Sequence, residues 1–467
     1  MNTEAKEATV ARVVDAETKL AATVDELRAA GVRYVSGSIV DTGSINRLKS
    51  VPLDRLASLA TNGIGFSYCW ATALTNDHFT ETDVLGGPSG DMRMIADLDS
   101  LVQMGATPQW AWVALDQYLQ DGSVAPWCQR SFAKRLVGQA AERGYSLRMT
   151  YEFEWFVGRV AGDGMLGACH LGPGYSSNAW ALVHPYALDL LDALAAERVD
   201  VECFHPEYSF GQMEVSTTPT DPVRAADQHV LFRHTARTVA AFHDYRCSFS
   251  PVVLPSGLGN GFHLHFSLWN EAGDNLFAGG DGPAGLTREG ESFLAGVLAE
   301  LPALVALACA TTPSYERLKP QNWSGAYRCW GQENREAALR FIPGMVGTRA
   351  QTANTEFKVV DGSGHPYLVV GAVIAAGLHG LEKGSRLPQP VAIDPHTMTP
   401  EERAAEGISQ LPSSLREAAE ALAGSAVLRA AMGDVLFDAM VAVRRAESEA
   451  DAGRPLDELV AEQLWRF

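Results

Sequence analysis

The chain has 467 residues, of which 46% are hydrophobic and 20% charged, and its formal net charge is −19. These proportions are typical of a globular chain that is long enough to bury a sizeable core. A negative charge of this size excludes nucleic acid and anionic membranes as expected partners, and it suits cations such as metal ions and protonated amines. We expect one large domain and a smaller one.

Cysteine usage and hydrophobic runs indicate a cytoplasmic protein. The seven cysteines are scattered, with an odd count and no CxxC pair, so neither a disulfide framework nor a zinc site is expected. Residues 1–14 form a polar, charged tail without the apolar stretch of a signal peptide. No later stretch has about 20 uninterrupted apolar residues, and we therefore expect no membrane span.

The first part of the chain predicts a small, strand-rich domain. The periodicity of residues 15–30 predicts an amphipathic helix, and residues 32–52 predict a β-hairpin. Short strands and turns continue until Pro126 marks a boundary. We therefore predict an N-terminal domain at 1–118 and a second domain at 119–467.

The second domain predicts both helices and strands, as expected of an α+β fold. Helices are predicted at 131–143, 185–197, 221–241, 287–309, 366–380, 415–423 and 426–446. Strands are predicted at 145–157, 199–215 and 356–358, in addition to a histidine-bearing strand. Asp221 followed by Pro222 is the clearest helix start, because it combines an N-cap with a proline at the first helical position.

The chain is organised around a glycine-rich turn that runs into this histidine-bearing strand, GLGNGFHLHFS, at residues 257–267. The period of two places His263, His265 and Ser267 on one face of the strand and apolar residues on the other. Two histidines with this spacing could bind a metal or a phosphate, or they could be structural.

Five glutamates lie on similar apolar, strand-like segments, where a carboxylate is costly unless it is paired or bound to a cation. They are Glu152, Glu154, Glu207, Glu214 and Glu356. A strand with one face in solvent would show the same alternation around Glu152 and Glu154. The presence of the histidine-bearing strand favours the interpretation that these glutamates belong to a cation-binding site.

Residues 311–343 are unusually rich in arginine and aromatic side chains. The arginines are Arg317, Arg328, Arg335 and Arg340. Guanidinium groups at this density in an acidic protein predict a clamp for carboxylate and phosphate groups. The alternative is that these arginines neutralise the surplus acidic surface.

Five glutamates, a histidine and nearby arginines fit a two-metal phosphoryl-transfer site. Oxygen ligands with a single imidazole select Mg²⁺ or Mn²⁺ over zinc. Two such ions can bridge the phosphates of a nucleotide while arginines neutralise the transferring group. The sequence has no GxxxxGK(S/T) loop and no kinase motif, so metals and strand-borne side chains must hold the nucleotide.

Six motifs in a fixed order resemble those of the glutamine synthetase family. They are Glu152-Phe153-Glu154, Gly211-Gln212-Met213-Glu214, the histidine strand at 261–267, Tyr315-Glu316-Arg317-Leu318, Glu333-Asn334-Arg335 with Arg340, and Glu356 before Pro366-Tyr367-Leu368. Each motif is weak by itself, but six in the right order and spacing are specific. The resemblance covers essentially the whole chain.

The resemblance implies an α+β fold, with an N-terminal β-grasp domain and a catalytic domain whose antiparallel sheet and helices form a funnel-like active site. In the family this site lies between adjacent subunits of a ring and is closed by the N-terminal domain of a neighbour. A ring oligomer, commonly a dodecamer, is therefore implied. The implied ligands are glutamate, an amine, ATP and two or more Mg²⁺ or Mn²⁺ ions.

The resemblance also implies roles for individual residues. Glu154, Glu207 and Glu214 would hold the first metal, and Glu152, His263 and Glu356 the second. His265 and Ser267 would line the nucleotide site, with Arg335 and Arg340 on the phosphates. Arg317 would clamp the α-carboxylate of glutamate with the backbone at Gly259, and Asp41 would be the base for the incoming amine.

The implied reaction is a two-step ligation. The γ-carboxylate of glutamate attacks the γ-phosphate of ATP, and an amine then captures the acyl phosphate. Phosphorylation suits this chemistry because it gives the carboxylate a leaving group, provided that water is kept out of the site.

Departures from the family pattern bear on the choice of amine. Trp323 stands six residues after Arg317, where ammonia-using members carry a flap glutamate. A tryptophan offers ammonium no carboxylate, but it gives a larger alkylammonium a cation–π surface. Lys358 stands where an arginine is usual, and it keeps the charge without the bidentate fork. Leu258 replaces an asparagine that touches glutamate.

Trp323 resembles the γ-glutamyl-amine ligase branches, which couple glutamate to polyamines, ethanolamine or small alkylamines. Our first hypothesis is an ATP-dependent ligase for such an amine. The alternative is a glutamine synthetase that uses ammonia, with another carboxylate in place of the flap glutamate. The second alternative is a catalytically inactive structural or regulatory member, whose expected loss of metal ligands is not seen.

Overall fold

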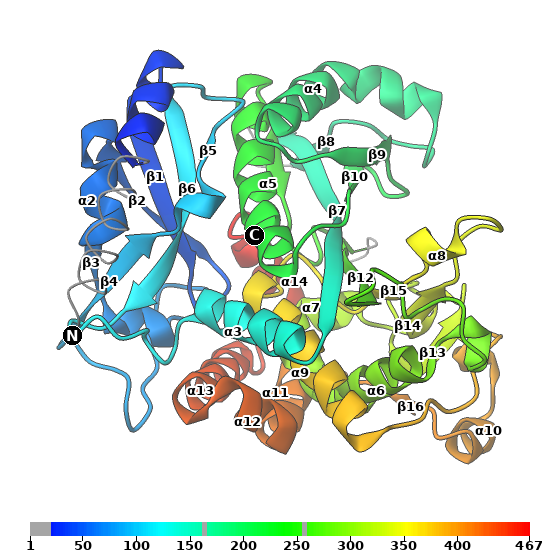
Figure 1. Cartoon of the computed structure of the whole chain (residues 1–467). Coiled ribbons are helices and arrows are strands. Elements are labelled where there is room, and N and C mark those ends of the chain that lie inside the picture. Colours follow the sequence, from blue (N-terminus) through cyan, green and yellow to red (C-terminus); the bar gives the residue numbers. More distant parts are fainter. Residues whose placement is uncertain (1–19, 161–165, 255–258) are drawn as a thin grey trace.

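The computed structural model describes residues 20–160, 166–254 and 259–467. The predicted charged tail, the start of the first helix and part of the glycine-rich turn lie outside the described residues. Residues 20–29 are helical, as their periodicity predicts. A smaller N-terminal part, coloured blue to cyan, stands beside a larger part coloured green to red (Figure 1).

The N-terminal part is built on a mixed sheet. Its strands are β1 (Tyr34–Val40), β2 (Asn46–Pro52), β3 (Ile64–Ser67), β4 (Asp91–Ala96), β5 (Val102–Gln103) and β6 (Trp110–Tyr118), and α2 (Leu56–Thr61) follows β2. The strand order is β2-β1-β6-β4-β3, with β5 beside β6. β1 pairs antiparallel with β2 and parallel with β6. The hairpin predicted near the start of the chain is therefore confirmed.

The larger part contains a second sheet, ordered β16-β13-β14-β15-β12-β7-β10-β9, with β8 and β11 also paired to β7. Its strands are β7 (Tyr145–Val160), β8 (Leu166–Ala168), β9 (Val201–Pro206), β10 (Gln212–Thr217), β11 (Arg246–Ser248), β12 (Phe262–Asn270), β13 (Tyr327–Gln332), β14 (Ala337–Ile342), β15 (Asn354–Phe357) and β16 (Ser409–Gln410). Its pairs are antiparallel except β13 with β14. The predicted α+β fold class, with an antiparallel catalytic sheet, is confirmed.

Helices pack around this sheet and extend to the C-terminus (Figure 1). They are α3 (Gln129–Glu142), α4 (Ser177–Ala196), α5 (Pro222–Phe242), α6 (Arg288–Ala308), α7 (Ser314–Arg317), α8 (Arg349–Thr352), α9 (Pro366–Lys383), α10 (Pro400–Ala405), α11 (Leu415–Ala423), α12 (Ala426–Met432), α13 (Asp434–Asp451) and α14 (Leu456–Gln463). Phe153 of β7 stacks on Phe232 of α5 with ring centroids 4.2 Å apart. Because side chains alternate along a strand, this apolar packing turns the intervening glutamates of β7 toward the other face.

Local capping signals placed several helix ends correctly. The side chain of Asp221 accepts hydrogen bonds from the backbone N–H groups of Val223 and Arg224 at the start of α5. Thr287 caps α6 in the same way. The helix predicted at 366–380 instead continues to Lys383, and Gly384 ends it with a φ of 59°, a left-handed conformation that glycine adopts without steric cost.

Three other predicted boundaries are wrong. α4 begins at Ser177 and contains Pro185, whose missing N–H leaves the Ala181 carbonyl to bond with the His184 ring (3.1 Å) instead. The strand predicted at 199–215 is two strands, β9 and β10, which pair antiparallel. The helix predicted at 426–446 is split into α12 and α13 by Gly433, which has a φ of 78°.

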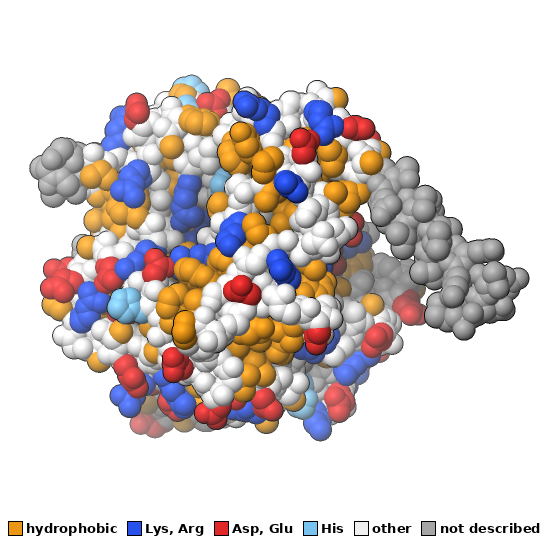
Figure 2. Space-filling model, turned by 90° about the vertical axis from the view of Figure 1, so that its left-hand side faces the viewer, with side chains coloured by type: hydrophobic (Ala, Val, Ile, Leu, Met, Phe, Trp, Pro, Cys, Tyr) orange, Lys and Arg blue, Asp and Glu red, His pale blue; other side chains and the backbone are white. Residues whose placement is uncertain are grey.

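Helix α6 is long and apolar enough to cross a membrane, but 83% of its apolar window is buried inside the protein. Its hydrophobic side chains are thus already covered by protein contacts and need no lipid. All seven cysteines are free, as their scattered positions predict. The face that Figure 2 shows carries hydrophobic patches interspersed with side chains of both charges.

Candidate active site

The register of the catalytic sheet brings polar side chains of neighbouring strands together. β7 lies between β12 and β10. His263 of β12 stands directly opposite Glu152 of β7, and Glu154 of β7 stands opposite Glu214 of β10. Opposed residues in an antiparallel pair lie close enough to interact. The predicted ligands therefore form a continuous row that no single segment contains.

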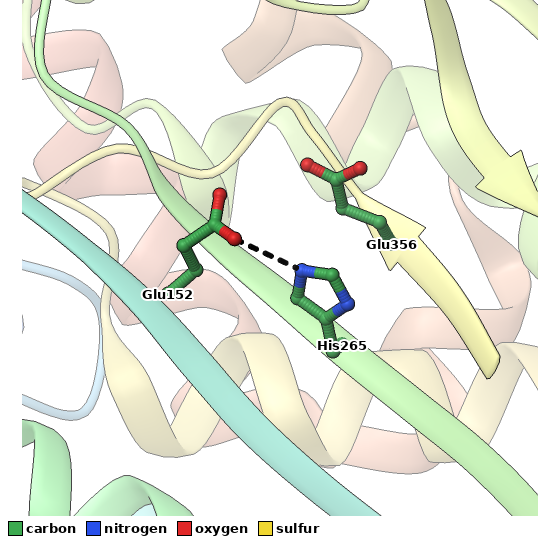
Figure 3. A group of neighbouring side chains, drawn as sticks. All are labelled: Glu152, His265 and Glu356. Carbon is green, nitrogen blue, oxygen red and sulfur yellow. Dashed lines mark ion pairs between the residues drawn. The ribbon is translucent and has the colours of Figure 1, made fainter. Parts of the chain in front are cut away.

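The row continues onto β15 and β14. Glu356 of β15 stands opposite both His265 of β12 and Arg340 of β14. Figure 3 shows Glu152, His265 and Glu356, from three different strands, pointing toward one another. The Nε2 atom of His265 lies 3.7 Å from Glu152 Oε2 and has no hydrogen-bond partner in the described part of the chain. His265 Nε2 therefore faces Glu152 in an ion pair that is too long for a hydrogen bond.

Three groups of side chains, two of which share Glu152, have donor atoms close enough to hold a metal ion. They are Glu152 with His265 and Glu356, Glu152 with Glu154 and His263, and His205 with Glu207 and Glu214. Within each group the donor atoms lie within 4.8 Å of one another. All six predicted metal ligands occur among these groups, but the groups differ from the two predicted sets, because Glu207 and Glu214 are grouped with His205 and not with Glu154. The assignment of ligands to two ions stays a prediction.

The carboxylates of the row differ in their protonation. Burial and repulsion from four neighbouring carboxylates raise the pKa of Glu214 to about 10. Burial acts in the same direction on Glu356, but Lys358, with its Nζ 2.9 Å away, and His263 hold the pKa of Glu356 well below its usual range. Burial acts in the same direction on Glu152, but the hydrogen bond from His263 (2.9 Å) and the ion pair with His265 outweigh it and lower the pKa of Glu152. Without a cation, the Glu214 end of the row keeps a proton.

Arg317 and two glycines fix the orientation of His263. Arg317 donates hydrogen bonds from Nη2 to His263 Nε2 (3.0 Å) and from Nη1 to the carbonyl of Val359 (3.0 Å). A Cβ atom at Gly259 would lie 2.7 Å from the Arg317 side chain, and one at Gly261 would lie 2.3 Å from the His263 ring. Only glycine fits at these two positions, which explains the glycine-rich turn.

Positive charge follows the row on β14 and β15. Arg340 pairs with Glu356 (3.1 Å) and with Glu333 (2.6 Å), while its Nε has no hydrogen-bond partner among the described residues. Arg335 is exposed at the start of β14. Ser267, predicted to line the nucleotide site, accepts a hydrogen bond from Trp269 Nε1 (2.9 Å). Arg328 instead donates to the carbonyl of Leu298 and does not join the row.

Trp323 lies on the loop between α7 and β13, and its side chain is 65% exposed. Both Trp323 and Gln321 have positive φ, at 55° and 66°. The buried carboxylate of Glu336 accepts the backbone N–H of Trp323 (2.8 Å) and of Gln321 (3.2 Å). Burial raises the pKa of Glu336. Glu336, which sequence reasoning missed, therefore holds this loop in an unusual conformation.

Asp41 lies apart from the row. Its carboxylate is fully buried at the β1–β2 turn, where it accepts hydrogen bonds from Arg47 Nε (2.7 Å) and from the backbone N–H of Ile45 (2.9 Å). Burial raises the pKa of Asp41 to about 6, against the attraction of Arg47. The structure does not bring Asp41 to the other predicted residues within one chain, and its role as a base stays a prediction.

Two polar contacts at the row were not predicted from the sequence. His205 Nε2 lies 2.9 Å from Glu207 and 3.5 Å from Glu214. Gln212 donates to Glu154 (2.9 Å) and so orients that carboxylate. His205 precedes Glu207 by two residues on a strand, and this spacing was the available signal, because it places both side chains on one face.

Comparison with known proteins accounts for this arrangement. Residues 126–457 match the glutamine synthetase catalytic domain, and residues 19–127 match the glutamine synthetase N-terminal domain. The chain belongs to the glutamine synthetase family. The resemblance drawn from the six sequence motifs is thereby confirmed.

The relatives of this glutamine synthetase family member include both a γ-glutamylpolyamine synthetase and glutamine synthetases. It is 46% identical to the γ-glutamylpolyamine synthetase of Streptomyces coelicolor, over 95% of this chain and 95% of that protein. It is 28% identical to a glutamine synthetase of Halobacterium salinarum, over 91% of this chain and 92% of that one. Both alignments extend over the N-terminal and the catalytic domain.

Solved structures of the family share the whole architecture. A structure described as a novel glutamine synthase homolog has a TM-score of 0.83 and 32% identity, and covers 93% of this chain and 99% of that one. The structure "GmaS/ADP complex-Conformation 1" has a TM-score of 0.81 and 27% identity, and covers 93% of this chain and 97% of that one. The two-domain fold is thus that of the family.

Proposed function

We propose that this chain is an ATP-dependent ligase that joins the γ-carboxylate of glutamate to a polyamine through a γ-glutamyl phosphate. The similarity to the Streptomyces coelicolor γ-glutamylpolyamine synthetase carries this proposal, because 46% identity extends over 95% of both chains. The row of carboxylates, histidines and arginines supplies the groups that such a reaction needs.

Two or more divalent cations fit the carboxylate row. The raised pKa of Glu214 marks a position where a cation would relieve the repulsion between buried carboxylates. The oxygen-rich ligand set favours Mg²⁺ or Mn²⁺, with Glu154, Glu207 and Glu214 on one ion and Glu152, His263 and Glu356 on the other. When bound, such ions would neutralise and polarise the phosphates of ATP.

The residues of the chain position the reactants around these cations. Arg340 on β14 and Arg335 just before it provide positive charge that stabilises the phosphates of ATP during transfer. Lys358, which pairs with Glu356, belongs to the glutamate-binding residues. Arg317 and the backbone at Gly259 hold the α-carboxylate of glutamate, so that its γ-carboxylate faces the γ-phosphate. The loop that carries Trp323 limits access of water to the acyl phosphate.

A polyamine suits this site better than ammonia. Its ammonium groups are separated by methylene chains, and Trp323 offers both an apolar surface and a cation–π contact. The net charge of −19 also attracts a polycation. Capture of the acyl phosphate requires the attacking nitrogen to lose a proton, for which Asp41 remains the predicted base.

Phosphate release from ATP tests the choice of amine. The enzyme is supplied with Mg²⁺, glutamate and one of ammonia, methylamine, isopropylamine, ethanolamine, putrescine or spermidine. We expect putrescine or spermidine to give the highest kcat/KM and ammonia little release. A higher rate with ammonia than with every amine would instead support the second candidate, glutamine synthesis. This candidate is retained because glutamine synthetases are among the relatives, at about 30% identity. The absence of phosphate release with every amine tested would support an inactive family member.

We also propose that the enzyme works in the cytoplasm as a ring, commonly of twelve subunits. The free cysteines and the buried position of α6 support the cytoplasm. Family membership supports the ring, in which a neighbour's N-terminal domain would close each active site.

A further inference from the structure

A cavity of about 340 Å³ lies between the β1–β2 hairpin of the N-terminal domain and helix α5. Ser44 and Asn46 line it from the hairpin, and His229, Arg233 and Arg237 line it from the helix. The three helix residues are spaced four apart, so they form one ridge along a single face of α5. Two arginines thus stand in the otherwise largely apolar wall of a cavity, in a protein whose net charge is −19.

This cavity is distinct from the active site. The His229 ring packs against Tyr151 and Phe262, with centroids 4.9 and 5.0 Å apart. Tyr151 and Phe262 are the strand neighbours of Glu152 and His263, and neighbouring residues in a strand point to opposite faces. The ridge of α5 therefore lies behind the sheet, and the metal-binding row lies in front of it.

The two arginines of the ridge make no close ion pair, and the buried carboxylate of Asp361 attracts Arg233 only from a longer distance. Neither Arg233 nor Arg237 makes a hydrogen bond or an ion pair with any residue in the described ranges. Arg233 is only 7% exposed, and both guanidinium groups rest on the ring of Phe249, at 5.4 and 5.0 Å. Burial lowers the pKa of Arg237 to about 10. A buried guanidinium without a counter-charge is unfavourable, because it has lost its water without gaining a partner.

Other arginines of the same chain have found carboxylate partners. Arg130 is equally buried but is paired with Asp97 (2.7 Å), Asp116 (3.0 Å) and Asp227 (2.8 Å). Arg466, at the rim of the cavity, pairs with Glu462 (2.7 Å). Arg233 and Arg237 instead stand unpaired at the cavity wall, where a ligand can reach them.

Unused hydrogen-bond donors accompany the charges. The Oγ of Ser44, the Nε of Arg233 and the Nη2 of Arg237 are buried and have no hydrogen-bond partner among the residues that the structure describes. Both domains therefore contribute donors, from the hairpin on one side and from α5 on the other. Guanidinium and hydroxyl donors in this arrangement match the oxygens of a carboxylate or phosphate.

We propose that this cavity binds a small oxyanion, either phosphate or a dicarboxylate, between Arg233, Arg237 and Ser44. The bound anion supplies the missing counter-charge and links the hairpin of the N-terminal domain to α5 of the catalytic domain. It therefore stabilises the junction between the two domains. This site adds to the proposed ligase activity and does not depend on it.

Thermal unfolding of the full-length protein tests the proposal, with sodium phosphate, sodium malonate and sodium chloride compared at equal ionic strength and pH. We expect the Tm to rise with phosphate or malonate beyond its value in chloride, because an anion that binds only the folded state stabilises it. The anion that raises the Tm identifies the source. Arg237→Met should weaken the binding of that anion by about tenfold or more, because it removes a charge-assisted contact.

Two variants distinguish anion binding in this cavity from anion binding at the nucleotide site. Arg335→Gln removes a cation from the proposed nucleotide site and should keep the anion-dependent rise in Tm, whereas Arg237→Met should lose it. If Arg237→Met does not fold, Ser44→Ala gives the same comparison with a smaller change. An equal rise in the wild type and in Arg237→Met, or no rise in the wild type, overturns the proposal. A changed oligomer mass in Arg237→Met, with no anion effect in the wild type, would assign the arginines to a subunit contact and overturn it as well.

Discussion

The carboxylates of the row differ in whether they are ionised. Glu356 is kept ionised by Lys358 and His263, whereas Glu214 faces other carboxylates across the row and has its pKa raised to about 10. The state of Glu214 therefore depends most on whether a cation is present. Trp323 is the other residue on which the proposed function depends, because we propose that it selects the amine.

Glu214→Gln should weaken Mn²⁺ binding by about tenfold or more, since it removes a negatively charged ligand. It should leave the Tm of the metal-free protein nearly unchanged, because Glu214 already holds a proton near neutral pH. Isothermal titration with Mn²⁺ measures the affinity. Glu333→Gln, which removes a half-exposed carboxylate outside the three groups, is the matched control. Equal Mn²⁺ affinity in the wild type and Glu214→Gln would contradict the assignment.

Trp323→Glu should shift the amine preference toward ammonia. The variant removes the apolar surface and places a carboxylate where ammonium can bind, so we expect the ratio of kcat/KM for spermidine to that for ammonia to fall by about tenfold or more. Trp180→Glu, at an exposed tryptophan of α4, should leave the ratio unchanged. An unchanged ratio in Trp323→Glu would show that the amine is chosen elsewhere.

At the scale of elements, hydrogen bonds to a buried carboxylate fix the loop between α7 and β13. Glu336 accepts two backbone N–H groups of this loop, at residues with positive φ. Another buried glutamate, Glu197, ends α4 and accepts hydrogen bonds from Gly105 (2.9 Å) and Thr235 (2.7 Å). Both carboxylates fix segments that are distant in sequence.

Glu336→Gln should raise the KM for the amine more than the KM for ATP. The amide keeps one acceptor where the loop needs two, so the loop that carries Trp323 becomes less ordered while the nucleotide site is untouched. Steady-state kinetics with each substrate varied in turn measure the difference. Glu316→Gln, which breaks a more exposed contact with Lys319 at the start of the same loop, is the control. A proportional rise in both KM values would argue against a local role.

Glu197 should make stability depend on pH. Burial raises its folded-state pKa from 4.5 to about 7, so the folded protein holds this proton more tightly than the unfolded chain does. Its stabilising contribution is fully present below pH 4.5 and is lost as the pH rises through about 7. Glu197→Gln should therefore gain up to about 3 kcal/mol relative to the wild type over this window.

Urea unfolding across about pH 4 to pH 8 measures this free-energy difference. Glu142→Gln, at the exposed end of α3, should show no such trend relative to the wild type. If the difference between Glu197→Gln and the wild type does not change with pH, Glu197 does not hold a proton in the folded protein.

At the scale of the whole molecule, buried polar contacts join the two domains. Arg130 of α3 binds Asp97 and Asp116 of the N-terminal domain together with Asp227 of α5. Breaking such a group by removing one partner is strongly destabilising, because it leaves a buried charge unpaired. The N-terminal domain is therefore fixed to the catalytic domain of its own chain.

A ring should be the form of the enzyme in solution. With a chain of 50.2 kDa, a dodecamer has a mass of about 600 kDa, which light scattering after size-exclusion chromatography measures directly. We expect activity to follow the ring fraction on dilution, since each active site would need a neighbour. An active monomer would contradict a shared site and would leave the role of Asp41 to another base.

The sequence by itself determined the local elements and the types of ligand. Capping residues such as Asp221 and Thr287 fix helix ends through contacts with the next few residues, and alternation on a strand fixes which side chains share a face. Six motifs in order were enough to recognise the family, because each motif lies within a short segment that can be read without knowing the fold. The boundaries that failed, at Pro185 and Gly433, depended on packing that local preference does not contain.

Only the tertiary structure decided which of these residues meet. Strand register brought His205 to Glu214 and Glu356 to His265, and chain folding placed Glu336 beneath Trp323. The same folding buried Asp41 against Arg47 and left the arginines of α5 facing a cavity without a counter-charge. These contacts join residues that are distant along the chain and that only the fold brings close in space. Local sequence preferences act over one or two turns of chain, and so they could not predict them.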